Sequence, residues 1–332
     1  MYRPGMYPAD FPLVVNRMIY FVLFFVTRIK WESDRRNLPL VDHDWQLYLD
    51  IHIASALRLR RLPDLQNPVG YNDQVKWLML FAQHELMPVC ADKVRVREYV
   101  SERLGPKVLI PIRVIANSWP EIEDELTRGP AVLKCSHDSG STTLLDSLDA
   151  KKIANLRQHY ERQLSREHGV GKGEWHYKGI EPRLVLEERL PGSDPRVGPA
   201  DIKVHCVNGQ PRMVHIIDNR QTDSRQAFFS AQGEPLSLSL KPHRGKINGF
   251  EFDKVKSIIL PLVTKLAEPF RYVRVDFYLV EDKPFFGEMT FFEEAGLFPR
   301  RSEEIELASA IGIECVNPRP TLHNSLWKDA SG

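Results

Sequence analysis

The chain has 332 residues, of which 42% are hydrophobic and 27% charged, and its net charge is +1. These values are typical of a folded globular protein and do not favour a polyanion such as nucleic acid as a partner. The four cysteines, Cys90, Cys135, Cys206 and Cys315, are far apart and form no CxxC pair, which argues against a zinc site or a disulfide framework and indicates a reducing compartment.

An apolar stretch at residues 11–30 dominates the N-terminal segment, residues 1–40. Its unbroken part, Met18–Val26, is shorter than the roughly 20 residues that a spanning helix needs, and no small-residue cleavage site follows it. Three interpretations remain open: a helix in a membrane interface, a helix packed on the protein's own core or on a partner, and a true span. The basic residues that an interfacial helix would place near anionic headgroups are Arg17, Arg28, Lys30, Arg35 and Arg36.

Helical spacing of apolar residues predicts a mainly helical region over 41–130. The helices expected there are 42–62, 72–81, 91–100 and 119–126, with one strand at 108–111.

A short apolar strand at 130–134 ends in Lys134 and leads into a loop of small hydroxylated residues, 135–143. Backbone N–H groups of such a loop can close over phosphates. The loop has no GxxxxGK[ST] pattern, so a P-loop NTPase is disfavoured, and ordinary turn chemistry explains the residues equally well.

The remaining pattern alternates strands and helices, with 219–244 predicted as irregular and a kink predicted at Pro261. Asn208-Gly209 predicts a hairpin turn. The expected strands are 183–190, 202–207 and 212–217, and the expected helices are 149–167, 252–267 and 302–311. Together with the helical first third, this order predicts an α+β fold with an antiparallel sheet.

Residues 271–290 are predicted to form a second hairpin, with strands at 272–280 and 285–290 around a turn at 281–284. Alternation places Arg274 with Asp276, and Glu288 with Thr290, on one face. Two carboxylates on paired strands suit a hard cation such as Mg²⁺ beside phosphate oxygens, and arginine suits phosphate or carboxylate charge. The alternative is a strand pair with solvated charges on its outer face.

Six segments, in this order, resemble the TupA-like ATP-grasp family, over roughly residues 60–300. The segments are 67–78, 91–100, 132–140, 186–190, 201–211 and 273–278 together with 287–290. The resemblance implies an ATP-grasp fold, in which two α+β lobes clamp ATP between antiparallel sheets, preceded by an α-helical N-terminal region. The implied parts are the segment 1–40, a helical region with the start of the core at 41–130, a nucleotide-binding lobe with the phosphate loop at 131–190, a C-terminal lobe with the Mg²⁺-binding hairpin at 191–320, and a tail at 321–332.

The resemblance also implies roles for individual residues, with ATP and Mg²⁺ as cofactors. The residues that would bind ATP are Lys93, Lys134, Ser136, Ser139, Gly140, Ser141, Glu187, Glu188, Arg189, Leu190, Asp194 and Lys203. Those that would hold the metal are Asp276, Glu288 and Thr290, and those that would act in catalysis are Arg274, Lys203, Asp276 and Glu288. The substrate candidates are His137, Arg212 and Arg225.

Two departures from the family pattern affect substrate recognition. His137-Asp138 stands where Asn-His is expected, and Phe292-Glu-Glu-Ala295 replaces a smaller run that contains proline. Glu293 and Glu294 are therefore either contacts to the acceptor or surface charge.

The resemblance implies an ADP-forming ligase that joins a carboxylate to an amine in bacterial surface polysaccharide biosynthesis, for example an amino acid to a uronic acid. Such an enzyme would lie in the cytoplasm, at the inner face of the membrane, with peripheral contact through residues 11–30. The alternatives are an ATP-grasp kinase that phosphorylates a sugar hydroxyl and a non-catalytic ATP-binding scaffold at the membrane.

Overall fold

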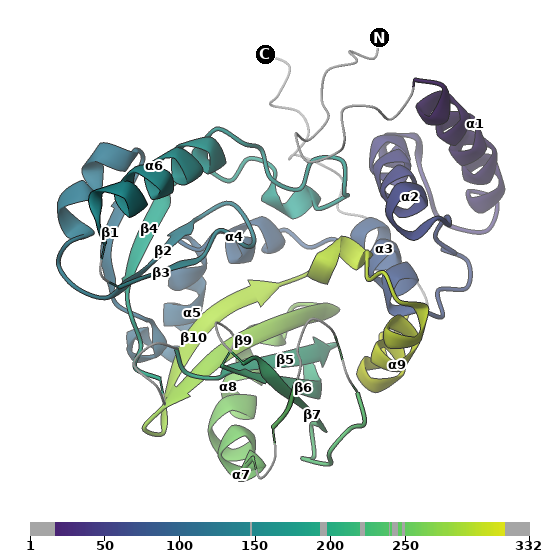
Figure 1. The fold of residues 1–332 in the computed structure, drawn as a ribbon. Coiled ribbons are helices and arrows are strands. Elements are labelled where there is room, and N and C mark those ends of the chain that lie inside the picture. Colours follow the sequence, from purple (N-terminus) through teal and green to yellow (C-terminus); the bar gives the residue numbers. More distant parts are fainter. Residues whose placement is uncertain are drawn as a thin grey trace.

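Two sheets organise the part of the chain that the computed structural model describes, residues 17–146, 148–192, 198–219, 223–238, 240, 245–247 and 250–315 (Figure 1). The smaller sheet is antiparallel with strand order β1-β4-β2-β3, and the larger has the order β10-β9-β5-β6-β7-β8. The smaller sheet contains β1 (Ile112–Ala116), β2 (Ala131–Cys135), β3 (Thr143–Leu145) and β4 (Leu184–Glu188). The larger sheet contains β5 (Asp201–Val207), β6 (Gln210–Asp218), β7 (Arg225–Ser230), β8 (Gly245–Lys246), β9 (Tyr272–Val280) and β10 (Lys283–Thr290).

Helices cover both sheets and build the N-terminal region (Figure 1). In chain order they are α1 (Arg17–Asp34), α2 (Trp45–Leu59), α3 (Tyr71–Phe81), α4 (Met87–Ala91), α5 (Val96–Leu104), α6 (Ala150–Leu164), α7 (Phe252–Lys254), α8 (Leu260–Ala267) and α9 (Arg301–Ile311). Helix α6 packs on β2, whereas α8 packs on β5, β6 and β9. Helix α3 contacts α2 and α9, and so links the N-terminal region to the end of the larger sheet.

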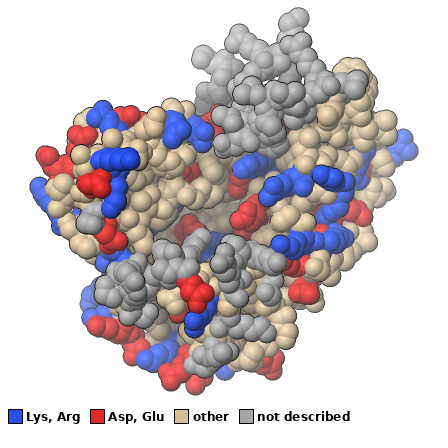
Figure 2. All heavy atoms as spheres, viewed as in Figure 1, with Lys and Arg blue, Asp and Glu red and all other residues tan. Residues whose placement is uncertain are grey.

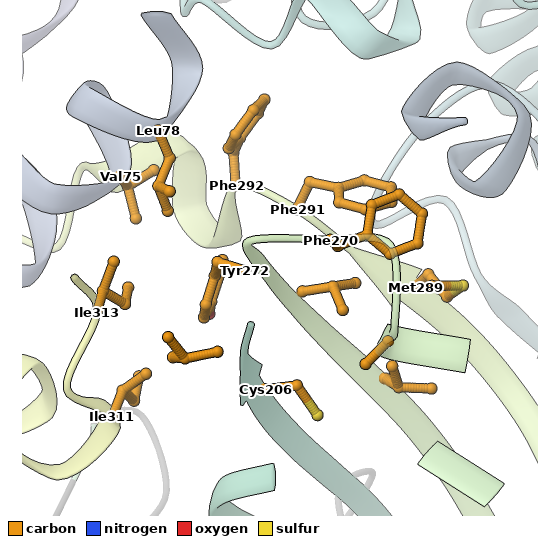
Figure 3. Packing of buried hydrophobic residues seen from close by; sticks show 14 of the residues in the cluster. Val75, Leu78, Cys206, Phe270, Tyr272, Met289, Phe291, Phe292, Ile311 and Ile313 are labelled. Carbon is orange, nitrogen blue, oxygen red and sulfur yellow. The ribbon is translucent and has the colours of Figure 1, made fainter. Parts of the chain in front are cut away.

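The two faces of the larger sheet differ because alternate side chains point to opposite sides. One face presents Val204, Val214 and Val275, all fully buried, and packs on Val263 of α8. The other face carries the charged residues described below. At the end of the sheet, apolar side chains from α3, from β9 and from the segment after β10 meet in one cluster (Figure 3).

Most predicted elements are confirmed, including both hairpins and the helices at α2, α3, α6 and α9. The strand predicted at 108–111 is wrong, because Pro106 opens a 3₁₀ turn and the strand begins only at Ile112. The helix predicted at 91–100 is interrupted, since α4 ends at Ala91 and α5 starts at Val96. The stretch predicted as irregular contains β7, whose polar residues hide the alternation.

The kink predicted at Pro261 takes the form of a π-helical turn, Val255–Ile259, between α7 and α8. Proline lacks a backbone N–H and cannot continue the hydrogen-bond ladder of a helix interior. A wider turn just before it accommodates the missing donor. The amphipathic segment therefore still buries Val255, Ile259 and Val263 against the sheet.

Helix α1 packs one side on α2. Trp31 is fully buried and meets Trp45 and Tyr48 edge to face, with ring centroids 5.4 and 4.9 Å away. Tyr48 also donates a 2.7 Å hydrogen bond to the buried carboxylate of Asp34. None of the helices in the described part of the chain is long and apolar enough to cross a membrane.

His52, fully buried in α2, makes folding sensitive to acid. Its Nδ1 donates to the Tyr48 carbonyl at 2.7 Å, and its Nε2 has no partner. Burial lowers the pKa of His52 from 6.5 to about 3, so below pH 6.5 the unfolded chain takes up a proton that the folded chain excludes. Stability from this residue is present above pH 6.5 and is lost as pH falls.

Replacing His52 with glutamine is therefore expected to flatten the acid side of the stability curve. Between pH 7 and pH 5 the free energy of unfolding should fall by about 2 kcal/mol less in the variant than in the parent. Denaturant unfolding at both pH values measures this. His159→Gln, on the half-exposed surface of α6, is the matched control, and equal slopes in the His52 variant and the parent would contradict the assignment.

Candidate active site

The hairpin of β9 and β10 carries the charged face of the larger sheet. Glu288 pairs with Asp276 and Thr290 with Arg274 across the strands, as alternation predicts. The turn is tighter than expected: Glu281 and Asp282 have φ of 49° and 62°, a two-residue turn, and β10 already begins at Lys283. Pro284 is tolerated inside β10 because this strand lies at the edge of the sheet.

Oxygen atoms of three other hairpin residues converge on Nη2 of Arg274. Its Nη2 lies 2.8 Å from Oδ2 of Asp276, 3.0 Å from Oε1 of Glu288 and 3.0 Å from Oγ1 of Thr290. Two carboxylates and one hydroxyl therefore surround a single cationic centre, and the hairpin charges are not a solvated outer face.

Asp276 is held in its ionised form although it is only 2% exposed. Burial would raise the pKa of Asp276, but Arg274 and Lys203 outweigh it and bring the pKa well below the usual range. Lys203 on β5 pairs with Asp276 in register, and its Nζ lies 2.5 Å from Oδ2. The carboxylate keeps its charge at neutral pH because two buried cations compensate it.

A second ion pair lies on the smaller sheet. Nζ of Lys134, near the end of β2, is 2.5 Å from Oε2 of Glu187 on β4, and Nη1 of Arg97 is 3.8 Å from Oε1 of the same carboxylate. All three side chains are largely shielded from solvent. Glu187 thus uses its side chain to compensate lysine charge rather than facing solvent.

Hydrogen bonds from Lys93 and within the loop itself fix the conformation of the loop after β2. Lys93 donates to the backbone carbonyl of Asp138, and Ser141 donates to the Asp138 carboxylate at 2.6 Å. Oγ of Ser141 also accepts from the backbone N–H of Cys135 at 3.0 Å. Gly140, at φ 95°, takes a backbone conformation that favours glycine. Lys93 and the predicted phosphate loop are therefore in direct contact.

Other loop residues fix the loop to its surroundings. Ser136 donates to the carbonyl of Glu181 at 2.8 Å, whereas the exposed Ser139 lies 3.4 Å from a ring nitrogen of His168. His137 is buried and pairs through Nε2 with the carbonyl of Gln163 at 3.1 Å, so its side chain is engaged within its own lobe.

Charges from both the loop and the hairpin act on Tyr177. Burial raises the pKa of its phenol well above 10, and the carboxylates of Glu174, Glu288 and Asp138 raise it further. Glu288 belongs to the hairpin and Asp138 to the loop. A cavity of about 270 Å³ beside the loop is lined by His137, Tyr177 and neighbouring residues. Figure 2 shows the molecular face hollowed between the lobes, with acidic and basic residues at the rim.

A larger cavity, about 400 Å³, lies at the turn end of the β9–β10 hairpin, next to Pro191. Ile216 and Leu279 in its lining alternate along their strands with residues on the Asp276 face, whereas Val280, also in its lining, has the same alternation as Asp276.

Glu188 and Arg189 of the predicted ATP-binding segment direct their side chains to partners beside the smaller sheet. Glu188 points away from Glu187 and forms a paired contact with Arg113, at 2.8 and 2.7 Å. Arg189 pairs with Asp146. Leu190 follows β4 and is half-buried, and Asp194 lies outside the described residues.

The two arginines predicted to contact substrate do not join the cluster. Arg225 pairs with Asp223 at 2.9 Å, and alternation puts it on the other face of β7 from Gln226, which meets His215 beside Lys203. Arg212 is exposed beside an irregularity in the β5–β6 pairing. The structure therefore does not bring Arg212 or Arg225 to the site.

Two features of the site were not predicted. Glu293, weighed from sequence as an acceptor contact or surface charge, pairs with Nη1 of Arg274 and is 17% exposed. Tyr272 connects His205, at 2.9 Å, to Tyr71 of α3, at 2.7 Å, beneath the same arginine. The unusual run Phe292-Glu-Glu-Ala295 was the only sequence signal for this part of the site.

A left-handed turn, Glu293–Gly296, holds Glu293 in place. Glu294 and Ala295 have φ of 50° and 52°, although neither is glycine. Nζ of the buried Lys76 on α3 donates to the carbonyl of Ala295 at 2.6 Å. A Cβ on Gly296 would lie 2.9 Å from the Val75 side chain, so the turn lies directly against α3.

The donor set of the hairpin fits a magnesium ion. Mg²⁺ in phosphate-transferring sites is commonly bound by one or two carboxylates together with phosphate oxygens. Asp276, Glu288 and Thr290 offer only oxygen ligands, and these already converge on one cation. Among the residues described, no group of three or more His, Cys, Asp or Glu side chains forms a metal site from protein ligands alone.

Comparison with known proteins agrees with this geometry. The family model described as TupA-like ATPgrasp matches residues 73–311, which include both sheets and most of α3. No curated protein sequence matches the chain.

Solved structures similar to the chain include three ligases and synthetases. D-alanine–D-alanine ligase from Bacillus anthracis has 14% identity, a TM-score of 0.38 and coverage of 70% of each chain. L-amino acid ligase from Bacillus licheniformis has 13% identity and a TM-score of 0.37 over 80% of this chain and 55% of the other. N5-carboxyaminoimidazole ribonucleotide synthetase from Thermus thermophilus has 15% identity and a TM-score of 0.34 over 68% and 53%.

The family match covers more than half of the sequence and both parts of the charged site, the loop with Lys134 and the hairpin with Asp276. The chain therefore belongs to the TupA-like ATP-grasp family.

Proposed function

We propose that the protein is an ATP-dependent ligase that joins a carboxylate to an amine and releases ADP and phosphate. The observation that carries the proposal is the convergence of Asp276, Glu288 and Thr290 around Arg274, in a chain whose family binds ATP. Transfer of a phosphoryl group depends mainly on positioning and charge compensation, and these residues offer both.

In this proposal each cation has a task. Lys134 and Lys93, on either side of the loop, bind phosphate oxygens of ATP, and Lys203 holds Asp276 in its charged form. Arg274 compensates the negative charge of the transferred phosphoryl group. Asp276, Glu288 and Thr290 would hold Mg²⁺, which would supply positive charge to offset that of the bound phosphates.

The reaction needs no nucleophilic side chain from the protein. A substrate carboxylate oxygen bonds to the γ-phosphorus as ADP leaves, and the amine then bonds to the acyl carbon as the phosphate leaves. Cys135, next to the loop, is fully buried, and burial raises the pKa of its thiol to about 12. It therefore remains a neutral packed side chain in this mechanism.

For the acceptor we propose the carboxylate of a uronic acid in a bacterial surface polysaccharide or its precursor, with an amino acid as the amine. The resemblance to the family supports this choice. Such precursors are assembled at the cytoplasmic face of the membrane, which is where we place the enzyme. The free cysteines of the described chain agree with a reducing compartment.

The test is ADP release in magnesium buffer with candidate uronic acids and amino acids, followed by mass analysis of the product. The ligase proposal expects ADP that depends on the amine and an amide product. ADP without amine and a phosphorylated sugar would instead identify a kinase. ATP binding without turnover on any acceptor of the uronic acid class would favour a non-catalytic scaffold.

Replacing Glu293 with glutamine is expected to lower turnover about tenfold while ATP affinity stays unchanged. The carboxylate holds Nη1 of Arg274, and a neutral amide holds it less firmly, although Asp276 still binds the same guanidinium. Steady-state kinetics and ATP titration measure the two effects. Glu294→Gln, exposed in the same turn, is the matched control, and equal losses in both variants would contradict a role for the Glu293 contact.

A further inference from the structure

The outward face of α1 is the most apolar surface in the described part of the chain. Among the described residues nine large hydrophobic side chains are exposed, and six of these nine belong to α1. They are Ile19, Phe21, Val22, Phe25, Val26 and Ile29, between 42% and 72% exposed. At 100° per residue they occupy a continuous arc of about 160°. Single exposed hydrophobic residues are ordinary, but a continuous patch of this kind marks an interaction surface.

Helix α1 is firmly attached to the rest of the protein by the side opposite this apolar arc. The opposite side of α1 is bound to α2 through the buried Trp31 and Asp34. Gln66 adds a 2.8 Å hydrogen bond to the Asp34 carboxylate. The helix is therefore fixed to the protein by one face and presents the other outward (Figure 1).

Basic residues border the arc. On the helical wheel Arg28 lies at one edge and Lys30 at the other, and Arg35 and Arg36 follow the last turn. The guanidinium of Arg28 lies over the Trp45 ring at 4.9 Å and pairs with Glu32 at 2.9 Å. Lys30 pairs with the buried Asp34 at 3.1 Å, and Arg35 pairs with Asp42 at 2.9 Å. Residues 17–36 contain five basic and two acidic side chains, and one of the acids, Asp34, is buried. An apolar centre with a basic border suits an anionic lipid surface.

We infer that α1 docks the protein on an anionic membrane surface, with the apolar arc inserted among the acyl chains near the headgroups and the basic border on lipid phosphates. The helix lies in the plane of the interface. This inference rests on the surface of α1 and does not depend on the reaction proposed above.

The experiment is co-sedimentation of the full chain with vesicles. Vesicles of equimolar phosphatidylglycerol and phosphatidylcholine should bind the protein at least about tenfold more tightly than phosphatidylcholine alone. The double variant Phe21→Ser/Ile29→Ser removes the two most exposed members of the arc and should weaken binding about tenfold or more. Val69→Ser/Ile115→Ser, which changes two exposed hydrophobic residues outside α1, should bind as the parent does.

A melting curve and the oligomeric state complete the test. Because Phe21 and Ile29 face outward, the double variant should melt within about 2 °C of the parent. The inference would be overturned if the parent protein did not bind anionic vesicles, or if the double variant bound them as tightly as the parent does. A large drop in the melting temperature of the double variant would show that the chain itself covers the arc. If the parent is a dimer that vesicles do not dissociate, and the double variant is a monomer, the arc is instead the contact with a second copy.

Discussion

Asp276→Asn is expected to reduce ATP turnover by about a thousandfold. The change removes one negative charge from the oxygen cluster that suits Mg²⁺ and leaves Arg274 and Lys203 with a neutral partner. Asp276 receives two hydrogen bonds from Arg274, at 2.7 and 2.8 Å, and one from Lys203 at 2.5 Å. ADP formation under saturating ATP and magnesium measures the loss.

Because Asp276 is buried, this variant needs a test of folding beside the kinetic one. Removing one partner of a buried ion pair commonly costs about 3–5 kcal/mol, so thermal melting must accompany the assay. Glu288→Gln separates the effects, since this side chain is 40% exposed and its replacement should cost turnover with little loss of stability. Asp282→Asn, in the exposed turn of the same hairpin, serves as the control. A folded Asp276 variant with full turnover would refute the proposed site.

Lys134→Met is expected to weaken ATP binding by about 10- to 150-fold, since a charge-assisted contact contributes roughly 1.5–3 kcal/mol. Lys134 extends from the end of β2 beside the loop, and its side chain is 12% exposed. Its present partner is the Glu187 carboxylate, which shares the ammonium group with phosphate oxygens when nucleotide binds.

Calorimetric titration with ATP in magnesium buffer measures this loss. Lys134→Arg keeps the charge and should restore part of the affinity, whereas Lys151→Met, on the exposed face of α6, should leave it unchanged. The Glu187 carboxylate retains Arg97 at 3.8 Å, which limits the cost to stability. An unaltered dissociation constant in Lys134→Met would show that the loop lobe does not hold the phosphates.

The local part of the site was predictable from sequence because it depends on alternation within a hairpin. The period of two along a strand is enough to place Arg274 beside Asp276, and a short turn fixes their register against Glu288 and Thr290. The same reasoning identified Lys134 at the end of its strand.

The remainder depends on pairings between distant segments. In the smaller sheet β4 lies between β1 and β2, so the contact of Glu187 with Lys134 and that of Glu188 with Arg113 come from an order that the sequence does not display. Arg225 was misplaced for a related reason: β7 was not recognised, and without the strand its face could not be assigned.

Glu293 was not placed because its backbone breaks a local preference. Residues other than glycine seldom adopt positive φ, so Glu294 and Ala295 give no sign of a left-handed turn. Tertiary contacts with α3 hold the conformation, and such contacts cannot be read from a window of neighbouring residues.

The hydrogen bond from Lys76 to the carbonyl of Ala295 makes the position of the Glu293 turn depend on α3. A substitution that lets α3 shift would move this turn and draw Glu293 away from Arg274. The guanidinium of Arg274 would then lose its position, although no residue of the charged cluster had been replaced. In the proposed ligase, loss of activity can therefore originate in α3, a helix that supplies none of the proposed metal or phosphate ligands.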